Sequence, residues 1–231
     1  MTGTVLVGTL TMACGGNGAS RDTASTTKPA SPPESPAVVD SGPAGDGRRT
    51  VLFLGTSLTA GLGLDPDSAY PQRIQRKIDA SRLPYQVVNA GVSGETSAGL
   101  LRRLDWVLRQ PAAVIVVETG ANDGLRGLAV SATRATIGNA LSRIRREQPN
   151  ASILLVQMEA PPNLGQEYTS EFRAMFADLA REHGATLMPF LLEGVAGVTR
   201  LNQGDGIHPN DAGERIVTDN VWRALQPMLT R

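Results

Sequence analysis

The sequence contains only two histidines, and one of them lies three residues after an aspartate. His208 belongs to segment 205–210 (DGIHPN), a predicted loop before the last predicted helix. An imidazole can act as a general base when a carboxylate holds one ring nitrogen and leaves the other free. The spacing therefore makes His208 a candidate base and Asp205 its orienting carboxylate. The other histidine, His183, precedes Gly184 at a predicted helix end, where a structural role is expected.

A serine follows the first buried strand that the sequence predicts. The apolar run 51–54 (VLFL) leads directly into segment 55–61 (GTSLTAG). Such a run followed by small residues predicts a strand of a parallel sheet that ends in a sharp turn. Ligands of open α/β sheets bind at the carboxyl ends of the strands, so Ser57 is a candidate nucleophile. The alternative is an inert serine in an ordinary turn.

Two later strand ends offer hydrogen-bond donors that could stabilise a tetrahedral oxyanion. Gly94 lies in segment 89–96 (NAGVSGET), where its backbone N–H can point out of a loop-to-helix junction. Asn122 lies in segment 118–124 (ETGANDG), where its side-chain amide can donate. Each residue also has a structural alternative, because glycine serves unusual backbone angles and asparagine makes turns.

The elements that position these residues alternate along the chain from residue 50 onward. Strands are predicted at 51–54, 86–88, 113–117, 153–158 and 186–190, and helices at 69–80, 96–109, 130–147, 170–182 and 211–229. A strand followed by a helix, five times, predicts a parallel sheet covered on both faces. We therefore expect an α/β fold, a three-layer α/β/α sandwich of flavodoxin-like type with a five-stranded parallel sheet.

Four blocks of the sequence, in order, resemble those of the SGNH (GDSL) hydrolases, over residues 50–229. The blocks are 55–61, 89–96, 120–127 and 205–210. The resemblance is closest to the bacterial branch of thioesterase I, protease I, lysophospholipase L1 and arylesterase. It implies that Ser57 is the nucleophile, that His208 is the general base and that Asp205 orients His208. It also implies an oxyanion hole formed by the N–H groups of Ser57 and Gly94 and by the Asn122 side chain.

The position before the serine departs from the family pattern. The usual Gly-Asp-Ser is Gly55-Thr56-Ser57 here, so the acidic neighbour of the nucleophile is absent. Threonine can still form hydrogen bonds but carries no charge, which leaves the anchoring of the loop and the pH profile as open questions. The Gly-x-Ser-x-Gly elbow is absent as well, and this argues against an α/β-hydrolase fold.

The resemblance implies a serine esterase that forms an acyl-serine intermediate and needs no metal or cofactor. We expect a small acyl ester or thioester as substrate, with a short to medium acyl group. Segment 157–165 resembles a substrate-facing loop, and Glu159 within it would disfavour long chains unless it points to solvent. The candidate substrate-binding residues are Ala121, Met158, Ala160 and Pro161. A carbohydrate O-deacetylase of the same family and, less favoured, a non-catalytic binding module remain as alternatives.

Composition limits the partners. The 22 basic and 22 acidic residues balance to a net charge of zero, which argues against a nucleic-acid partner. A single cysteine excludes an intrachain disulfide. The chain is long enough for one domain of ordinary size, and its oligomeric state is left open by the sequence.

The first 49 residues differ from the rest of the chain. Residues 1–14 resemble a signal segment that ends in a lipobox, with Cys14 as the lipidated residue, although no Lys or Arg precedes it. Residues 15–49 are rich in Ser, Thr, Pro and Gly and predict a disordered tether, and residues 50–231 form the predicted hydrolase domain. We thus expect an exported protein, periplasmic or at the cell surface, held to a membrane through Cys14. The alternative is an unprocessed N-terminus.

Overall fold

The computed structural model describes residues 47–230. Within this range, five parallel strands form one sheet in the order β2-β1-β3-β4-β5. This is the flavodoxin-like order, as the sequence predicted. The strands are β1 (Arg49–Gly55), β2 (Tyr85–Gly91), β3 (Val114–Val117), β4 (Ser152–Val156) and β5 (Thr186–Met188).

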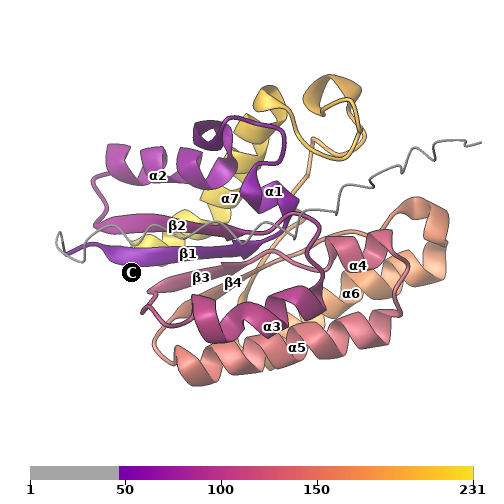
Figure 1. Cartoon of the computed structure of the whole chain (residues 1–231), viewed down its shortest axis with the longest axis horizontal. Helices are drawn as coiled ribbons and strands as arrows, with labels where there is room; N and C mark the ends of the chain where they lie inside the picture. Colours follow the sequence, from indigo (N-terminus) through magenta and orange to yellow (C-terminus); the bar gives the residue numbers. More distant parts are fainter. Residues whose placement is uncertain (1–46, 231) are drawn as a thin grey trace, which may run out of the picture. The chain divides into compact units, whose positions relative to one another are not determined.

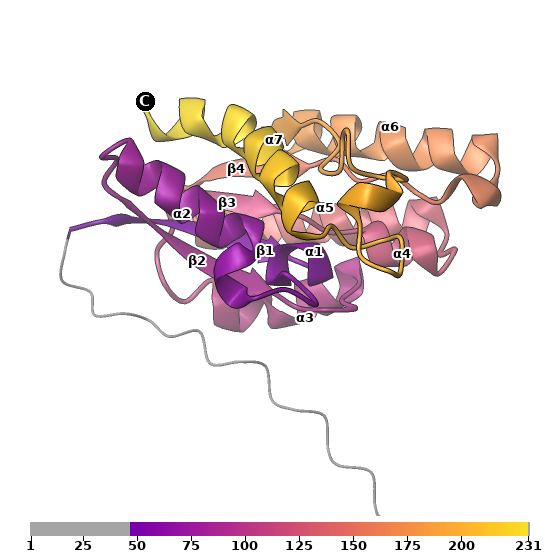
Figure 2. The ribbon, with the colours of Figure 1, turned by 90° about the horizontal axis from the view of Figure 1, so that it is seen from above.

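Helices cover both faces of the sheet (Figure 1). On one face α2 (Tyr70–Ala80) packs against α7 (Asp211–Leu229). On the other face α5 (Val130–Glu147) lies between α3 (Ser97–Val107) and α6 (Gln166–Glu182). Figure 2, seen from above, shows α2 and α7 in front of the strands, so the expected three layers are present.

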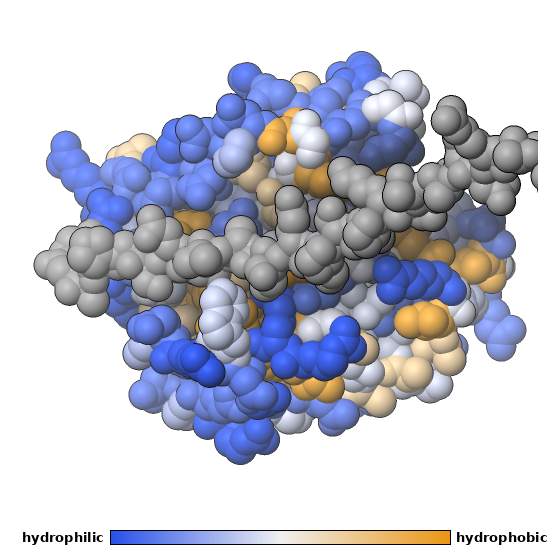
Figure 3. Space-filling view, in the orientation of Figure 1, coloured by the Kyte–Doolittle hydropathy of each residue, from blue (hydrophilic) through white to orange (hydrophobic). Residues whose placement is uncertain are grey.

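The buried strands hold the core together. All four residues of β3 are buried, and so are the last five of β1, because helices lie on both faces of these central strands. Apolar helix side chains such as Ile74, Ile137 and Phe176 complete the same cluster. On the face drawn in Figure 3, hydrophilic residues predominate and apolar ones form smaller patches.

Several boundaries differ from the sequence prediction. Helix α6 begins at Gln166 rather than at residue 170, and β4 ends at Val156 rather than at 158. The predicted tether was to reach residue 49, but Arg49 already belongs to β1. Its guanidinium lies 5.0 Å from the centre of the Tyr85 ring and donates to the Tyr85 hydroxyl, which fixes this end of the strand. The predictions for residues 1–14, including Cys14, and for most of 15–49 lie outside the described residues.

Two short helices that the sequence did not predict follow the central strands. They are α1 (Ser57–Ala60), after β1, and α4 (Ala121–Leu125), after β3. Strands β1 and β3 are neighbours in the sheet, but the chain leaves them in opposite directions, toward β2 on one side and β4 on the other. Such a switch point opens a crevice at the carboxyl ends of the strands.

In residues 47–230 no helix has the length and apolar character needed to cross a bilayer.

Candidate active site at the carboxyl ends of β1 and β3

The structure brings the candidate nucleophile, base and acid into one hydrogen-bonded row. The Ser57 Oγ lies 2.8 Å from the His208 Nε2. On the other side of the ring, the His208 Nδ1 lies 2.6 Å from the Asp205 Oδ2. With a proton on Nδ1 donated to the carboxylate, Nε2 is free to accept the serine hydrogen. Residues 151 positions apart in the sequence therefore meet at one point.

The Asp205 carboxylate is also held by the backbone of its own loop. Its Oδ1 accepts hydrogen bonds from the N–H groups of Ile207 and His208, at 2.9 and 3.0 Å. The bonds from the His208 backbone and ring, and then that from Ile207, hold the pKa of Asp205 well below its usual value. Asp205 is thus a carboxylate throughout the neutral range and keeps the imidazole in one orientation.

Gln203 ties this loop to the serine turn. Its backbone N–H donates to the His208 carbonyl at 2.7 Å, and its side-chain amide donates to the Leu62 carbonyl at 2.8 Å. Leu62 directly follows Gly61, the residue that caps α1 with a φ of 73°. Gln203 therefore holds the loop of the base against the helix of the nucleophile.

Two backbone N–H groups are free to face a substrate oxyanion. Ser57 is the first residue of α1, and neither its N–H nor that of Gly94 has an acceptor among the described residues. Gly94 has a φ of +75° and open space where a Cβ would stand. Its carbonyl accepts a hydrogen bond from Arg126 at 3.0 Å, which fixes the loop from the α4 side.

The Asn122 amide comes from a third strand end. Its Nδ2 donates one hydrogen to the Glu95 carbonyl at 2.9 Å, which leaves the second amide hydrogen free. The next residue, Asp123, is buried and accepts from the N–H and the hydroxyl of Ser97, at 2.8 and 2.6 Å. These contacts join the loops of Gly94 and Asn122, so the two donors keep a fixed relation. Neither Asp123 nor Ser97 was predicted from the sequence.

A second buried carboxylate anchors the serine turn and was also missed. Glu118 follows β3, is fully buried, and accepts hydrogen bonds from the N–H and the hydroxyl of Thr56, at 2.7 and 3.0 Å. The Thr59 hydroxyl donates to the same carboxylate at 2.9 Å. Thr56 is therefore anchored without the acidic side chain that the family pattern places there. The one available signal was a charged residue directly after an all-apolar strand.

The four candidate substrate-binding residues lie in two neighbouring segments. Ala121 is in α4, while Ala160 and Pro161 follow β4, and all three are partly exposed. Met158 is 2% exposed and belongs to the core cluster, so it lies beneath this surface. Glu159 pairs with Arg173 of α6 at 3.0 Å, and the Arg173 side chain is 60% exposed. This pairing directs the charge toward the exposed side of α6.

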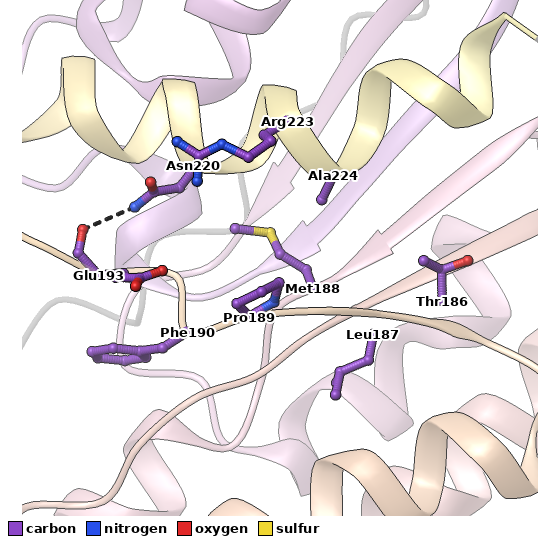
Figure 4. A pocket seen from close by; sticks show the side chains of 9 residues that line it. All are labelled: Thr186, Leu187, Met188, Pro189, Phe190, Glu193, Asn220, Arg223 and Ala224. Carbon is purple, nitrogen blue, oxygen red and sulfur yellow. Dashed lines mark hydrogen bonds between the residues drawn. The ribbon is translucent and has the colours of Figure 1, made fainter.

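One hollow of the described surface contains none of the predicted site residues. It measures about 220 Å³ and lies at the free edge of the sheet, between β5 with the segment after it and α7 (Figure 4). There Asn220 donates to the Glu193 carbonyl at 3.0 Å.

Within residues 47–230, no group of three or more His, Cys, Asp or Glu side chains is arranged to hold a metal.

Residues 53–216 match the model of the GDSL-like lipase/acylhydrolase family, which also carries the name SGNH hydrolases. The chain belongs to this family. The matched range contains the residues of the candidate site, Ser57, Gly94, Asn122, Asp205 and His208.

Relatives within the GDSL family carry esterase and thioesterase names. Esterase TesA of Pseudomonas aeruginosa is 38% identical over 182 residues, 78% of this chain and 90% of its own length. Thioesterase 1/protease 1/lysophospholipase L1 of Escherichia coli is 36% identical over 181 residues, 78% and 85% of the two chains. An arylesterase of Vibrio mimicus is 30% identical over 176 residues, which are 76% of this chain and 87% of its own length.

Solved structures of GDSL esterases share the fold. The crystal structure of TesA superposes with a TM-score of 0.74 at 38% identity, covering 78% of this chain and 99% of the other. The psychrotrophic esterase EstA of Pseudoalteromonas sp., in a structure inhibited by monoethylphosphonate, superposes with a TM-score of 0.75 at 33% identity. The match covers 79% of this chain and 100% of the other. The chain is thus a serine esterase of the GDSL family, in the branch that the sequence indicated.

Proposed function

We propose that Ser57, His208 and Asp205 hydrolyse acyl esters or thioesters in two steps. The observation that carries the proposal is the row of hydrogen bonds from Ser57 through His208 to Asp205, at 2.8 and 2.6 Å. His208 takes the serine proton as Ser57 Oγ attacks the acyl carbon, and then gives it to the leaving alkoxide or thiolate. Water, deprotonated by the same imidazole, then attacks the acyl-serine and releases the acid.

The oxyanion of each tetrahedral intermediate is assigned to three donors. They are the N–H groups of Ser57 and Gly94 and the free amide hydrogen of Asn122. Each comes from a different strand end. Hydrogen bonds from Asn122, Arg126 and Ser97 hold the last two, and the bonds of Thr56 and Thr59 to Glu118 hold the turn of Ser57, before substrate binds. Preorganised donors of this kind stabilise charge that develops only in the transition state.

The acyl group is proposed to be short to medium and to lie against Ala121, Ala160 and Pro161, with Met158 packed beneath. The two segments that carry these residues are in contact, since a Cβ at Gly124 of α4 would lie 3.4 Å from both Ala160 and Phe172. Glu159 adds no such limit, because it is paired with Arg173. A series of p-nitrophenyl esters and acyl-CoA thioesters from two to sixteen carbons tests the proposal, and a maximum at long chains would refute it.

Two single substitutions test the catalytic roles. Ser57→Ala and His208→Ala should each lower kcat on p-nitrophenyl butyrate by about 10⁴-fold or more, since the members of such a triad act as a unit. His183→Ala is the matched control, because the other histidine caps the end of α6 and its carbonyl accepts from Arg145. Turnover close to that of the wild type in Ser57→Ala or His208→Ala would overturn the assignment.

We also propose export and a lipid tether through Cys14. The support is the signal-like segment before it and the composition of residues 15–46. The enzyme would then act outside the cytoplasm, near a membrane surface.

A further inference from the structure

One buried carboxylate beside the serine turn has no part in the acyl-transfer steps. Glu118 is fully buried, and its three hydrogen-bond donors all belong to the turn that presents Ser57. They are the backbone N–H of Thr56 and the hydroxyls of Thr56 and Thr59. Burial raises the pKa of the Glu118 carboxyl above its ordinary value, and the hydrogen bonds from Thr56 and Thr59 oppose that rise. A buried charge is costly unless it is hydrogen-bonded, so these donors are what favours the ionised form.

An ionised Glu118 also fixes the direction of the next hydrogen bond. The Thr59 hydroxyl has one hydrogen, which it donates to Glu118, so the Tyr70 hydroxyl must donate to Thr59 across their 2.6 Å contact. Burial, and then the charge of Glu118, raise the pKa of Tyr70 well above its ordinary value, which keeps that donor protonated. The chain of donors therefore runs from Tyr70 through Thr59 to Glu118.

Helix α1 depends on these contacts because it has little stability of its own. It is four residues long, and its N-cap residue, Thr56, makes no side-chain capping bond. An isolated helix of this length does not form in water. The hydroxyl of Thr56 that could cap the helix is instead directed to Glu118. The Thr56 side chain thus ties α1 to Glu118, directly after β3, instead of capping its own helix.

We propose that Glu118 is a positioning residue of the acyl-transfer reaction, acting through Thr56 and Thr59. The turn that it holds carries two reacting groups at once, the Ser57 hydroxyl and the Ser57 N–H. The proposal rests on the function proposed above. It also gives Thr56 a role, because an aspartate at 56 would place a second carboxylate against Glu118, and like charges at one site oppose ionisation.

The test is Glu118→Gln, measured per active site. Titration with a fluorophosphonate counts the reactive serines. Turnover divided by that count separates a lower rate per active site from a smaller number of active sites. A glutamine has nearly the same shape but offers one acceptor oxygen to three donors, so the turn loses part of its anchor. We expect kcat per titrated site to fall about 10- to 100-fold with KM within about threefold, as for a small misplacement of a reacting group.

Matched variants keep the test decisive. Glu214→Gln changes another buried glutamate, on α7, and should leave kcat per site unchanged at neutral pH. Thr56→Val removes the hydroxyl at constant shape and should slow the reaction more than Thr56→Ser, which retains it. This pair decides the question if Glu118→Gln does not fold.

The outcomes are distinct. A loss of about fivefold or more per titrated site supports the positioning role. A smaller loss overturns it, even if melting temperature or titrated fraction falls, because Glu118 would then be only structural. If the wild type is not labelled at Ser57, the proposed function itself is wrong, whereas a labelled wild type with an unaffected Glu118→Gln removes this inference alone.

Discussion

At the scale of single residues, some groups of the site could be predicted from the sequence and others could not. Ser57 could be predicted because it follows a buried strand, and Asp205 and His208 because the chain has only two histidines and one of them lies three residues after an aspartate. Glu118 could not, because its partners Thr56 and Thr59 lie about sixty positions away and meet it only through the pairing of β1 with β3. Residues that carry out the chemistry can be predicted from their residue types and spacing. The residues that hold them in place become evident only from their contacts in the structure.

Asn122 provides a prediction at this scale. Asn122→Ala removes one oxyanion donor and should lower kcat by about 100- to 1,000-fold with little change in KM, because the bond forms in the transition state. Steady-state kinetics on p-nitrophenyl butyrate measure it. Asn150→Ala, in the exposed turn before β4, is the control and should match the wild type. Equal kinetics for the two variants would exclude the Asn122 amide from the oxyanion hole.

At the scale of elements, the five strands and the five long helices followed from their apolar patterns. Helices α1 and α4 did not, because four and five residues are too few to show a helical period. These two are the elements that carry Ser57 and Asn122. The long elements thus determine the frame, and tertiary contacts determine the short ones.

The approach of α1 to β2 is tested by Gly91→Ala. A Cβ at Gly91 would lie 2.4 Å from the Ala60 nitrogen, so α1 has to move away from the sheet. We expect a loss of about 1–3 kcal/mol in the free energy of unfolding, as for other overpacked sites, together with a fall in kcat. Chemical denaturation and steady-state kinetics measure the two effects.

Gly138→Ala is the control for this substitution. Its Cβ would make only ordinary contacts, with Leu179 at 3.4 Å and His183 at 3.5 Å. The position lies inside α5, where alanine favours the helix. If Gly91→Ala is as stable and as active as Gly138→Ala, the close packing of α1 on β2 is not required.

The contact of α7 with α2 predicts a pH-dependent stability. Burial raises the pKa of Glu214 to about 8, and the Tyr70 backbone N–H offsets only part of this rise. The ordinary pKa of glutamate in an unfolded chain is about 4.3. The stabilising contribution of neutral Glu214 is therefore complete below about pH 4.3 and is lost as the pH rises through about 8.

Glu214→Gln keeps the neutral form at every pH. Between pH 5 and 9 the wild type should lose about 2–4 kcal/mol of unfolding free energy relative to the variant, at about 1.4 kcal/mol per unit of pKa. Urea midpoints at pH 5, 7 and 9 measure the difference. Parallel pH profiles for the two proteins would show that Glu214 does not titrate in this range.

At the scale of the whole molecule, the order of the strands explains why distant blocks meet. The chain turns outward in both directions from β1 and β3, so the loops after both strands open on one crevice. Four segments spread over 150 positions reach this edge of the sheet. The fold class was predictable from the alternation of elements, while the register that aligns the loops required the structure.

The tether proposed above, through Cys14, predicts the form of the mature protein. Mass spectrometry of the N-terminus from the native host should find a chain that begins at Cys14 and carries lipid. Cys14→Ser should abolish the lipid and release the enzyme from the membrane fraction. An intact Met1 in the native host would contradict both export and lipidation.

The central claim is that Ser57 is the nucleophile of an esterase, and covalent labelling tests it most directly. A fluorophosphonate probe should modify one residue of the wild type, found by peptide mass spectrometry at Ser57, and should abolish turnover in proportion. Ser57→Ala should not be labelled, and His208→Ala should be labelled far more slowly. Labelling at another residue, or a Ser57→Ala variant that is labelled and active like the wild type, would contradict the account.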